Sequence, residues 1–331
     1  MGLKRLFNEI VDAIHEKDGQ TDGIAAKDFP RRIRSLATIE ADTDWHISRM
    51  PIASAWYSTL YHNGMYFIGS STGHLYYSQN GIVWLETRLP DKIGNILFLT
   101  HFNGKYIAIG PKTTAHSDDL KTWELSPSFI YGANSFNKFA SNGNVIIGSD
   151  SAKHMVRSTN GINWTSTTIS HTYVSSNSTG IIYGNGIWVR LSDMNNINVY
   201  SDDDGVSWKI QQQNVAFAPY VAAFGNNVFL SINSTGKYVT RSDDGITWEL
   251  VSDVQHPFKR PRQMKFIDGR FVVISEQGGA YESRDNGETW SPVGTLWDDS
   301  WSVLEYGDGT LITAANGSYV GAYIKWRRDN P

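Results

Sequence analysis

The eight residues Ser201-Asp202-Asp203-Asp204-Gly205-Val206-Ser207-Trp208 recur later in the chain as Ser283-Arg284-Asp285-Asn286-Gly287-Glu288-Thr289-Trp290. We call this pattern a box: a serine, an Asp or Asn two positions later, a glycine and a closing tryptophan. Four further boxes are one residue shorter, and they begin at Ser78, Ser117, Ser158 and Ser242; in the box at Ser117, Leu120 replaces the glycine. The closing tryptophans follow one another at about 40 residues: Trp84, Trp123, Trp164, Trp208, Trp248 and Trp290. A repeat of this length indicates a propeller or a solenoid.

Tight turns repeat in the same phase as the boxes. There are seven of them: Asn63-Gly64, Asn103-Gly104, Asn142-Gly143, Asn185-Gly186, Gly225-Asn226, Asp268-Gly269 and Asp308-Gly309. Such dipeptides supply the positive φ that primed hairpin turns require. Each turn separates short apolar runs that are typical of strands covered on both faces. The sequence therefore predicts an all-β fold, a seven-bladed β-propeller with four strands in each blade.

The seventh repeat predicts how the ring closes. It contains three strand-like runs and ends at Pro331 without a fourth. Near the other end of the chain, Trp45 lies 39 positions before Trp84, one full repeat. We therefore expect residues 44–49 to form the outer strand of blade seven, which leaves only short, protected sheet edges. The predicted domains are a helical module over residues 1–40 and the propeller over residues 41–331.

The box side chains have a structural explanation. An Asp or Asn side chain accepts hydrogen bonds from nearby backbone N–H groups, the glycine takes a positive φ, and the tryptophan packs between sheets. Because each box stands alone, we interpret its carboxylates as scaffold and not as metal ligands. The residues assigned this role in the two long boxes are Ser201, Asp203, Gly205, Trp208, Ser283, Asp285, Gly287 and Trp290.

The box pattern resembles the Asp-box (BNR) repeat of bacterial sialidases, xyloglucan-degrading glycosidases and sortilin-type receptors. The resemblance covers roughly residues 44–331. It implies a propeller whose boxes lie on the face away from the ligand site, and it leaves the activity open because a fold does not fix a function.

Composition restricts the classes of function. The net charge is −4, which gives no electrostatic footprint for nucleic acid. The chain has no cysteine and therefore no disulfide or thiolate metal site. No apolar run approaches the ~20 residues of a membrane helix. We expect no nucleic-acid partner, no membrane insertion, no signal peptide, no cofactor and no metal.

The first 40 residues predict an attachment or oligomerisation module. Residues 3–17 carry one apolar stripe, and a second short helix begins near Asp28 and Pro30. The segment from Ile10 to Leu36 is similar to a module of tail and baseplate proteins of phages that infect Gram-positive bacteria, from which it departs at His15 and Phe29. That resemblance implies a virion protein, assembled in the bacterial cytoplasm, that contacts phage tail or baseplate proteins through residues 1–40 and forms a homo-oligomer, with a trimer favoured.

Two clusters are candidate ligand sites on the face opposite the boxes. Trp56 and Trp301 each lie seven residues before a hairpin turn, in blades that meet at the ring closure. The sequence predicts a glycan-stacking platform there, or else packing between blades, from Trp56, Tyr57, Trp297, Asp298, Asp299 and Trp301. The second cluster, at the entrance of blade six, joins Lys259, Arg260 and Arg262 with His256. It predicts either a site for an anionic group or a solvated loop.

The function expected from these features is that of a phage tail receptor-binding protein. Its propeller would recognise a bacterial surface glycan, a polysaccharide or a teichoic acid, without cleaving it. The alternative is a glycan-degrading propeller enzyme, possibly tail-borne, in which Asp298 or Asp299 would pair with Asp193, Asp253 or Glu276. Because nothing in the sequence brings two such carboxylates to the separation that glycosidases need, we assign no catalytic residues.

Overall fold

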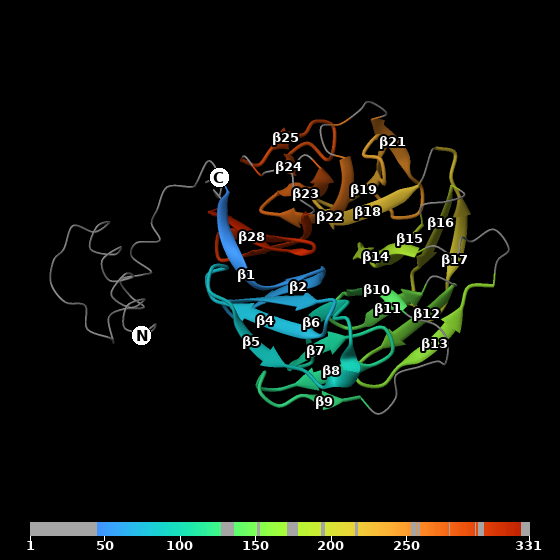
Figure 1. Ribbon diagram of the computed structural model, residues 1–331. Helices are drawn as coiled ribbons and strands as arrows, with labels where there is room; N and C mark the ends of the chain where they lie inside the picture. The colour runs from blue at the N-terminus through green and yellow to red at the C-terminus, as the bar shows by residue number, and fades with distance from the viewer. Residues whose placement is uncertain are drawn as a thin grey trace, which may run out of the picture.

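Seven antiparallel sheets, each of four strands, stand around a central axis in the computed structural model of the chain (Figure 1). The predicted all-β, seven-bladed propeller is thereby confirmed. The structure describes residues 45–126, 136–150, 153–170, 178–192, 196–215, 218–252, 256, 259–277, 279–294, 296 and 301–325. The predicted helical module, residues 1–40, lies outside these ranges. None of the described residues belongs to a helix with the length and apolar content that a membrane crossing requires.

The strands of each blade are given from the channel outward. Blade one holds β2 (Trp56–His62), β3 (Met65–Ser70), β4 (His74–Ser78) and β5 (Leu85–Arg88). A 3-10 helix, η1 (Asp91–Ile93), leads to blade two, with β6 (Phe98–Phe102), β7 (Lys105–Ile109), β8 (Thr114–Ser117) and β9 (Glu124–Leu125). Blade three holds β10 (Phe136–Ser141), β11 (Ile146–Asp150), β12 (His154–Ser158) and β13 (Thr165–Thr168).

The remaining blades repeat this order. Blade four holds β14 (Ser178–Gly184), β15 (Ile187–Ser192), β16 (Ile197–Ser201) and β17 (Lys209–Gln212). Blade five holds β18 (Pro219–Gly225), β19 (Val228–Asn233), β20 (Val239–Ser242) and β21 (Glu249–Ser252). Blade six holds β22 (Lys259–Ile267), β23 (Arg270–Gln277), β24 (Gly279–Ser283) and β25 (Ser291–Pro292). Blade seven holds β26 (Trp301–Gly307), β27 (Thr310–Ala315), β28 (Ser318–Lys325) and β1 (His46–Ser54).

The ring closes through β1, as the spacing of Trp45 predicts. This strand pairs antiparallel with β28, with His46 opposite Tyr323, so blade seven combines both ends of the described chain (Figure 1). It runs to Ser54 and is thus longer than the predicted 44–49. Trp45 Nε1 donates a hydrogen bond to the Val293 carbonyl of blade six at 2.6 Å, which ties the closing strand to the neighbouring blade.

The core consists of apolar layers between blades. Seven clusters of buried residues each contain side chains of two neighbouring blades, so every blade-to-blade contact has its own layer. Between blades four and five, for example, Val189 and Leu191 pack with Phe229 and Trp248. Each strand is covered by the preceding blade on one face and by the next blade on the other. The apolar runs of the sequence are therefore nearly continuous.

The boxes form the predicted backbone turns. Ser201 Oγ accepts a hydrogen bond from the Gly205 N–H at 2.9 Å, and Asp203 accepts one from the Ser207 N–H at 2.9 Å. Gly205 has a φ of 78°, and a Cβ there would lie 2.3 Å from Ile147 Cδ1 of blade three. The glycine is therefore required both by backbone conformation and by the approach of the preceding blade.

Hairpin turns and boxes share one face of the ring, because side chains of the turns bind the next box. Asn103 Nδ2 donates to the Thr159 carbonyl at 3.0 Å, and Asn142 Nδ2 donates to Asp204 Oδ1 at 3.1 Å. Equivalent bonds at 3.4 Å and 3.1 Å continue around the ring from Asn185 to Asp243 and from Asn226 to Asn286. The opposite face is left to the connections between blades and to the loops between second and third strands.

The two tryptophans that flank the closure lie inside the apolar layers. Trp56 and Trp301 are each only 1% exposed, Trp56 between blades seven and one and Trp301 between blades six and seven. A register shift follows each of them, because the pairing with the second strand skips one residue between Trp56 and Ser58 and between Trp301 and Val303. The shift directs the tryptophans between blades, so their rings are not available as the predicted glycan platform, and the packing alternative is correct for both.

The burial of Trp301 can be measured through stability. We expect Trp301→Ala to lower the free energy of unfolding by about 3–5 kcal/mol, because it removes a buried indole and leaves a cavity. Tyr57→Ala, at the bulge residue of blade one, whose side chain is 45% exposed, should change it by no more than about 1 kcal/mol. Urea unfolding of both variants and the wild type makes the comparison, and equal effects would contradict this assignment.

From the lowered pKa values of the box carboxylates we predict that the fold loses stability in acid. Burial opposes ionisation of Asp203, Asp244 and Asp285, but hydrogen bonds from neighbouring backbone and hydroxyl donors outweigh it and lower the pKa of each below its usual value. A depressed pKa stabilises the fold above the unfolded value of about 3.9, and this contribution is lost as the pH falls through the folded value. We expect Tm to fall as the pH is lowered below about 4.

The matched control replaces these three aspartates by asparagine, the residue that already occupies the same box position at Asn80 and Asn160. The triple variant should show a smaller drop in Tm over the same pH range, because its side chains accept the bonds without titrating. An identical acid dependence in both proteins would show that the boxes do not contribute to it.

Candidate functional site

The mouth of the central channel is built by one position of the inner strands. Residues six positions before the Asn or Asp of a hairpin turn line a cavity of about 330 Å³ at the axis: Tyr57, Leu97, Thr179, Tyr220 and Arg262. In four of these strands the residue is the extra one at the register shift, as at Tyr220 between Pro219 and Val221. A bulge re-aims a side chain, and here it turns these residues toward the channel and their predecessors between blades.

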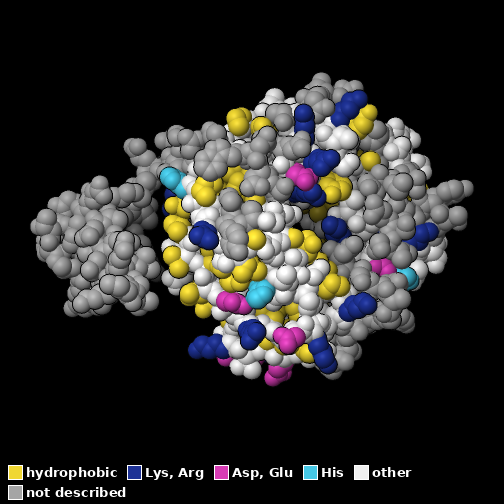
Figure 2. Space-filling model, in the orientation of Figure 1, with side chains coloured by type: hydrophobic (Ala, Val, Ile, Leu, Met, Phe, Trp, Pro, Cys, Tyr) yellow, Lys and Arg dark blue, Asp and Glu magenta, His cyan; other side chains and the backbone are white. Residues whose placement is uncertain are grey.

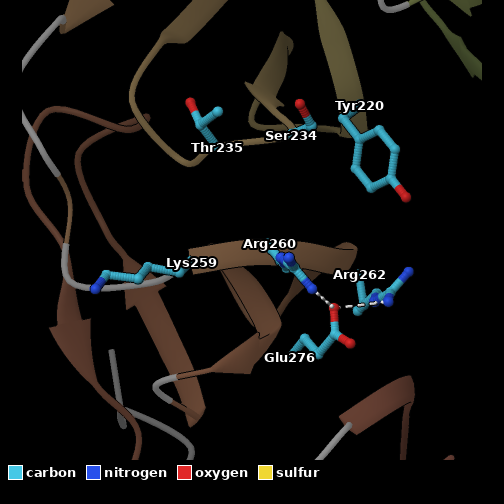
Figure 3. A pocket seen from close by; sticks show the side chains of 7 residues that line it. All are labelled: Tyr220, Ser234, Thr235, Lys259, Arg260, Arg262 and Glu276. Atoms are coloured by element: carbon cyan, nitrogen blue, oxygen red, sulfur yellow. Dashed lines mark hydrogen bonds and ion pairs between the residues drawn. The ribbon is translucent and has the colours of Figure 1, made fainter.

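A second and larger cavity, of about 550 Å³, lies between blades five and six. Tyr220 of β18 and the turn residues Ser234 and Thr235 form one wall (Figure 3). The facing wall consists of Lys259, Arg260 and Arg262 from β22 and Glu276 from β23 (Figure 3). Tyr220 and Arg262 also line the channel, so the two cavities adjoin.

Glu276 organises the cations of this wall. Its Oε2 accepts a hydrogen bond from Arg262 Nη2 at 2.7 Å and lies 3.7 Å from Arg260 Nη1 (Figure 3). The carboxylate is 19% exposed, whereas the side chain of Arg260 is 68% exposed. Three cations and one carboxylate leave the described lining with an excess of positive charge.

Arg260 has an unusual backbone conformation. Its φ is 52°, in the left-handed region, and Pro261 follows it. This conformation costs a non-glycine residue roughly 1–2 kcal/mol. Strain of this kind is concentrated at binding sites, and here it places the guanidinium over the cavity beside Glu276.

The charged residues are concentrated near the axis of the ring. On the face seen in Figure 2, Lys and Arg side chains gather with a carboxylate beside the central opening, over the region that Figure 1 labels β22 and β23. Apolar side chains surround this region on several sides (Figure 2).

The structure brings some of the predicted site residues together and places others elsewhere. Lys259, Arg260 and Arg262 line the cavity together, and Tyr57 lies at the channel mouth, 45% exposed. His256, predicted beside them, is buried at 7% exposure, and burial lowers its pKa. Trp297, Asp298 and Asp299 lie outside the described residues, and Trp56 and Trp301 are buried between blades.

Sequence reasoning did not connect this site with the residues that come from other blades, from turns or from second strands. Tyr220, Ser234, Thr235 and Glu276 complete the cavity, and Lys138 of β10 lines the channel. Tyr220 and Arg262 could have been paired by counting six residues back from the Asn or Asp of each hairpin turn, Asn226 and Asp268. The sequence named Glu276 only as a possible carboxylate of the enzyme alternative, because only the pairing of β22 with β23 brings it beside Arg262.

This arrangement is suited to holding a negatively charged group. Arginine guanidiniums bind carboxylate or phosphate oxygens through paired N–H donors, and the hydroxyls of the facing wall can bind polyol or sugar oxygens. Within the described part of the chain, no three His, Asp or Glu side chains are placed to bind a metal ion together.

No protein-family model matches the chain, and no curated protein matches it. Solved structures do. A catalytically inactive virginiamycin B lyase from Staphylococcus aureus with quinupristin is 12% identical, with a TM-score of 0.69 over 85% of this chain and 99% of that one. YCF48 bound to D1 peptide is also 12% identical, with a TM-score of 0.69 over 87% and 97%. The Pan2 WD40 domain of Neurospora crassa is 9% identical, with a TM-score of 0.64 over 88% and 98%. At these identities the likeness shows a β-propeller fold and does not transfer a ligand or an activity.

Proposed function

We propose that this chain is a phage tail receptor-binding protein whose propeller binds an anionic bacterial surface glycan, a teichoic acid in particular, without cleaving it. The observation that carries the proposal is the cavity between blades five and six, where Lys259, Arg260 and Arg262 face Tyr220 and two hydroxyl side chains.

The chemistry of the cavity matches a polyol or sugar phosphate. A phosphate accepts several hydrogen bonds at once, as the guanidinium of the largely exposed Arg260 can provide. Tyr220 offers an aromatic ring and a phenolic hydroxyl to the organic part of the ligand. A neutral polysaccharide would leave the excess positive charge without a partner, so the cavity favours the teichoic acid over the uncharged glycan.

The proposed place in the virion comes from residues 1–40 and their resemblance to tail and baseplate modules. We assign to this segment the attachment to phage tail or baseplate proteins and the assembly of a trimer. The propeller would then be the distal, receptor-binding part, because its ligand face is formed by loops on a rigid scaffold.

The alternative, a glycan-degrading enzyme, requires two carboxylates about 5–10 Å apart at the scissile bond. Among its described lining residues the cavity has one carboxylate, Glu276, and this one is engaged by Arg262 and Arg260. Such ion pairs favour the role of positioning guanidiniums over the role of general acid.

Binding tests the proposal directly. Isothermal titration calorimetry with purified poly(glycerol phosphate) teichoic acid should show binding, and a neutral dextran of similar length should not bind. Arg260→Gln should weaken the binding about tenfold or more, since a hydrogen bond to a charged group contributes about 1.5–3 kcal/mol. Release of glycerol phosphate or reducing sugar during a day of incubation would instead support the enzyme.

The matched control is Lys121→Gln. Lys121 is an exposed residue of the box in blade two, on the opposite face of the ring, and this substitution removes the same unit of charge. Its affinity should stay within about twofold of the wild type, which corresponds to less than 0.5 kcal/mol. If both variants lose affinity equally, the attraction is due to net charge and not to the cavity.

Assembly can be measured separately. Analytical ultracentrifugation of residues 1–331 should give a trimer, and residues 41–331 should give a monomer with an unchanged Tm, because the described ring closes through β1 without the first 40 residues. A monomeric full chain would contradict the role assigned to residues 1–40.

A further inference from the structure

Lys138 lies in the channel in a setting that is unusual for a lysine. It belongs to β10, the inner strand of blade three, and lines the 330 Å³ channel cavity together with Arg262 of blade six. Burial lowers the pKa of Lys138, and the charge of Arg262 lowers it further. Two cations from separate blades thus share one space at the axis.

The other cations of the channel mouth pair with carboxylates, whereas Lys138 has no such pair among the described residues. Lys265, another channel residue, pairs with Glu305 at 2.7 Å, and Arg262 pairs with Glu276 at 2.7 Å. No carboxylate in the described ranges pairs with Lys138. A partly buried cation without a counter-ion is costly, and its cost is removed when an anion binds beside it.

The channel and the cavity between blades five and six share two lining residues. Arg262 and Tyr220 line both, so a ligand that extends past Arg262 reaches the channel mouth, which Lys138 also lines. Tyr57 also lines the mouth and is 45% exposed, which makes a ring face available to the organic unit of the ligand.

We propose that Lys138 and Arg262 form a second anion subsite in the channel mouth, so that the ligand is a polyanion that places consecutive phosphates in the two cavities. This inference rests on the proposed function and narrows its ligand: one phosphate lies against Lys259 and Arg260, and the next lies against Lys138. A single charged group can satisfy only one of the two subsites.

The experiment uses the full chain and varies two things: the length of the ligand and the residue at each subsite. The probes are sn-glycerol 3-phosphate and an oligo(glycerol phosphate) with two phosphodiester-linked units, titrated by calorimetry. The wild type should bind the two-unit oligomer at least about tenfold more tightly, because the second phosphate binds at high effective concentration. Lys138→Met should abolish this gain, whereas Arg260→Gln should weaken both probes and should leave a gain in place.

The outcomes separate this inference from the proposed function. If Lys138→Met retains the full gain, or if the wild type binds both probes equally, the second subsite is wrong and the cavity between blades five and six remains the site. If neither probe binds the wild type, the proposed function fails and the second subsite fails with it. Lys138→Met should unfold at the same Tm as the wild type or a higher one, since it removes a partly buried cation, so a loss of binding is not a loss of fold.

Discussion

The apolar layers between neighbouring blades are the constraint on which the structure depends. A four-stranded sheet has two faces, and a ring allows each face to be covered by the next blade. The described residues form one buried cluster at each of the seven contacts. Closure by β1 completes the last of these layers, and the bond from Trp45 to the carbonyl of Val293 joins it to blade six. Tryptophans at the inner strands therefore pack between blades, because burying a large ring there stabilises the fold more than leaving the ring exposed to solvent.

The parts of the fold that follow from local rules could be predicted from the sequence. Hairpin turns and boxes each depend on a few adjacent residues, and their spacing gives the number of blades and the strand that closes the ring. The side on which an inner-strand residue points could not be read in the same way. A bulge inserts one unpaired residue and re-aims its side chain, so Tyr57 lines the channel whereas the adjacent Trp56 packs between blades.

The candidate site was predictable to the extent that its residues are close in sequence. Lys259, Arg260 and Arg262 lie within four positions on β22, and the sequence predicted for them either an anion site or a solvated loop. Tyr220 and Lys138 reach the same region from other blades, 42 and 124 positions before Arg262. Only the closed ring brings them together: the spacing to the hairpin turn marks Tyr220, but no local pattern indicates Lys138.

The carboxylate within the cationic cavity determines which ligands the site can distinguish. Glu276 holds Arg262 and Arg260 in place, which reduces the entropy lost when they bind a ligand, but it also offsets part of their charge. A weak or single anion must compete with this carboxylate for the same guanidinium donors. Lys138 has no such competitor among the described residues, although its lowered pKa makes its charge more costly to keep without an anion. The two effects act in the same direction: they disfavour small monoanions and favour a ligand whose regularly spaced charges engage both places at once.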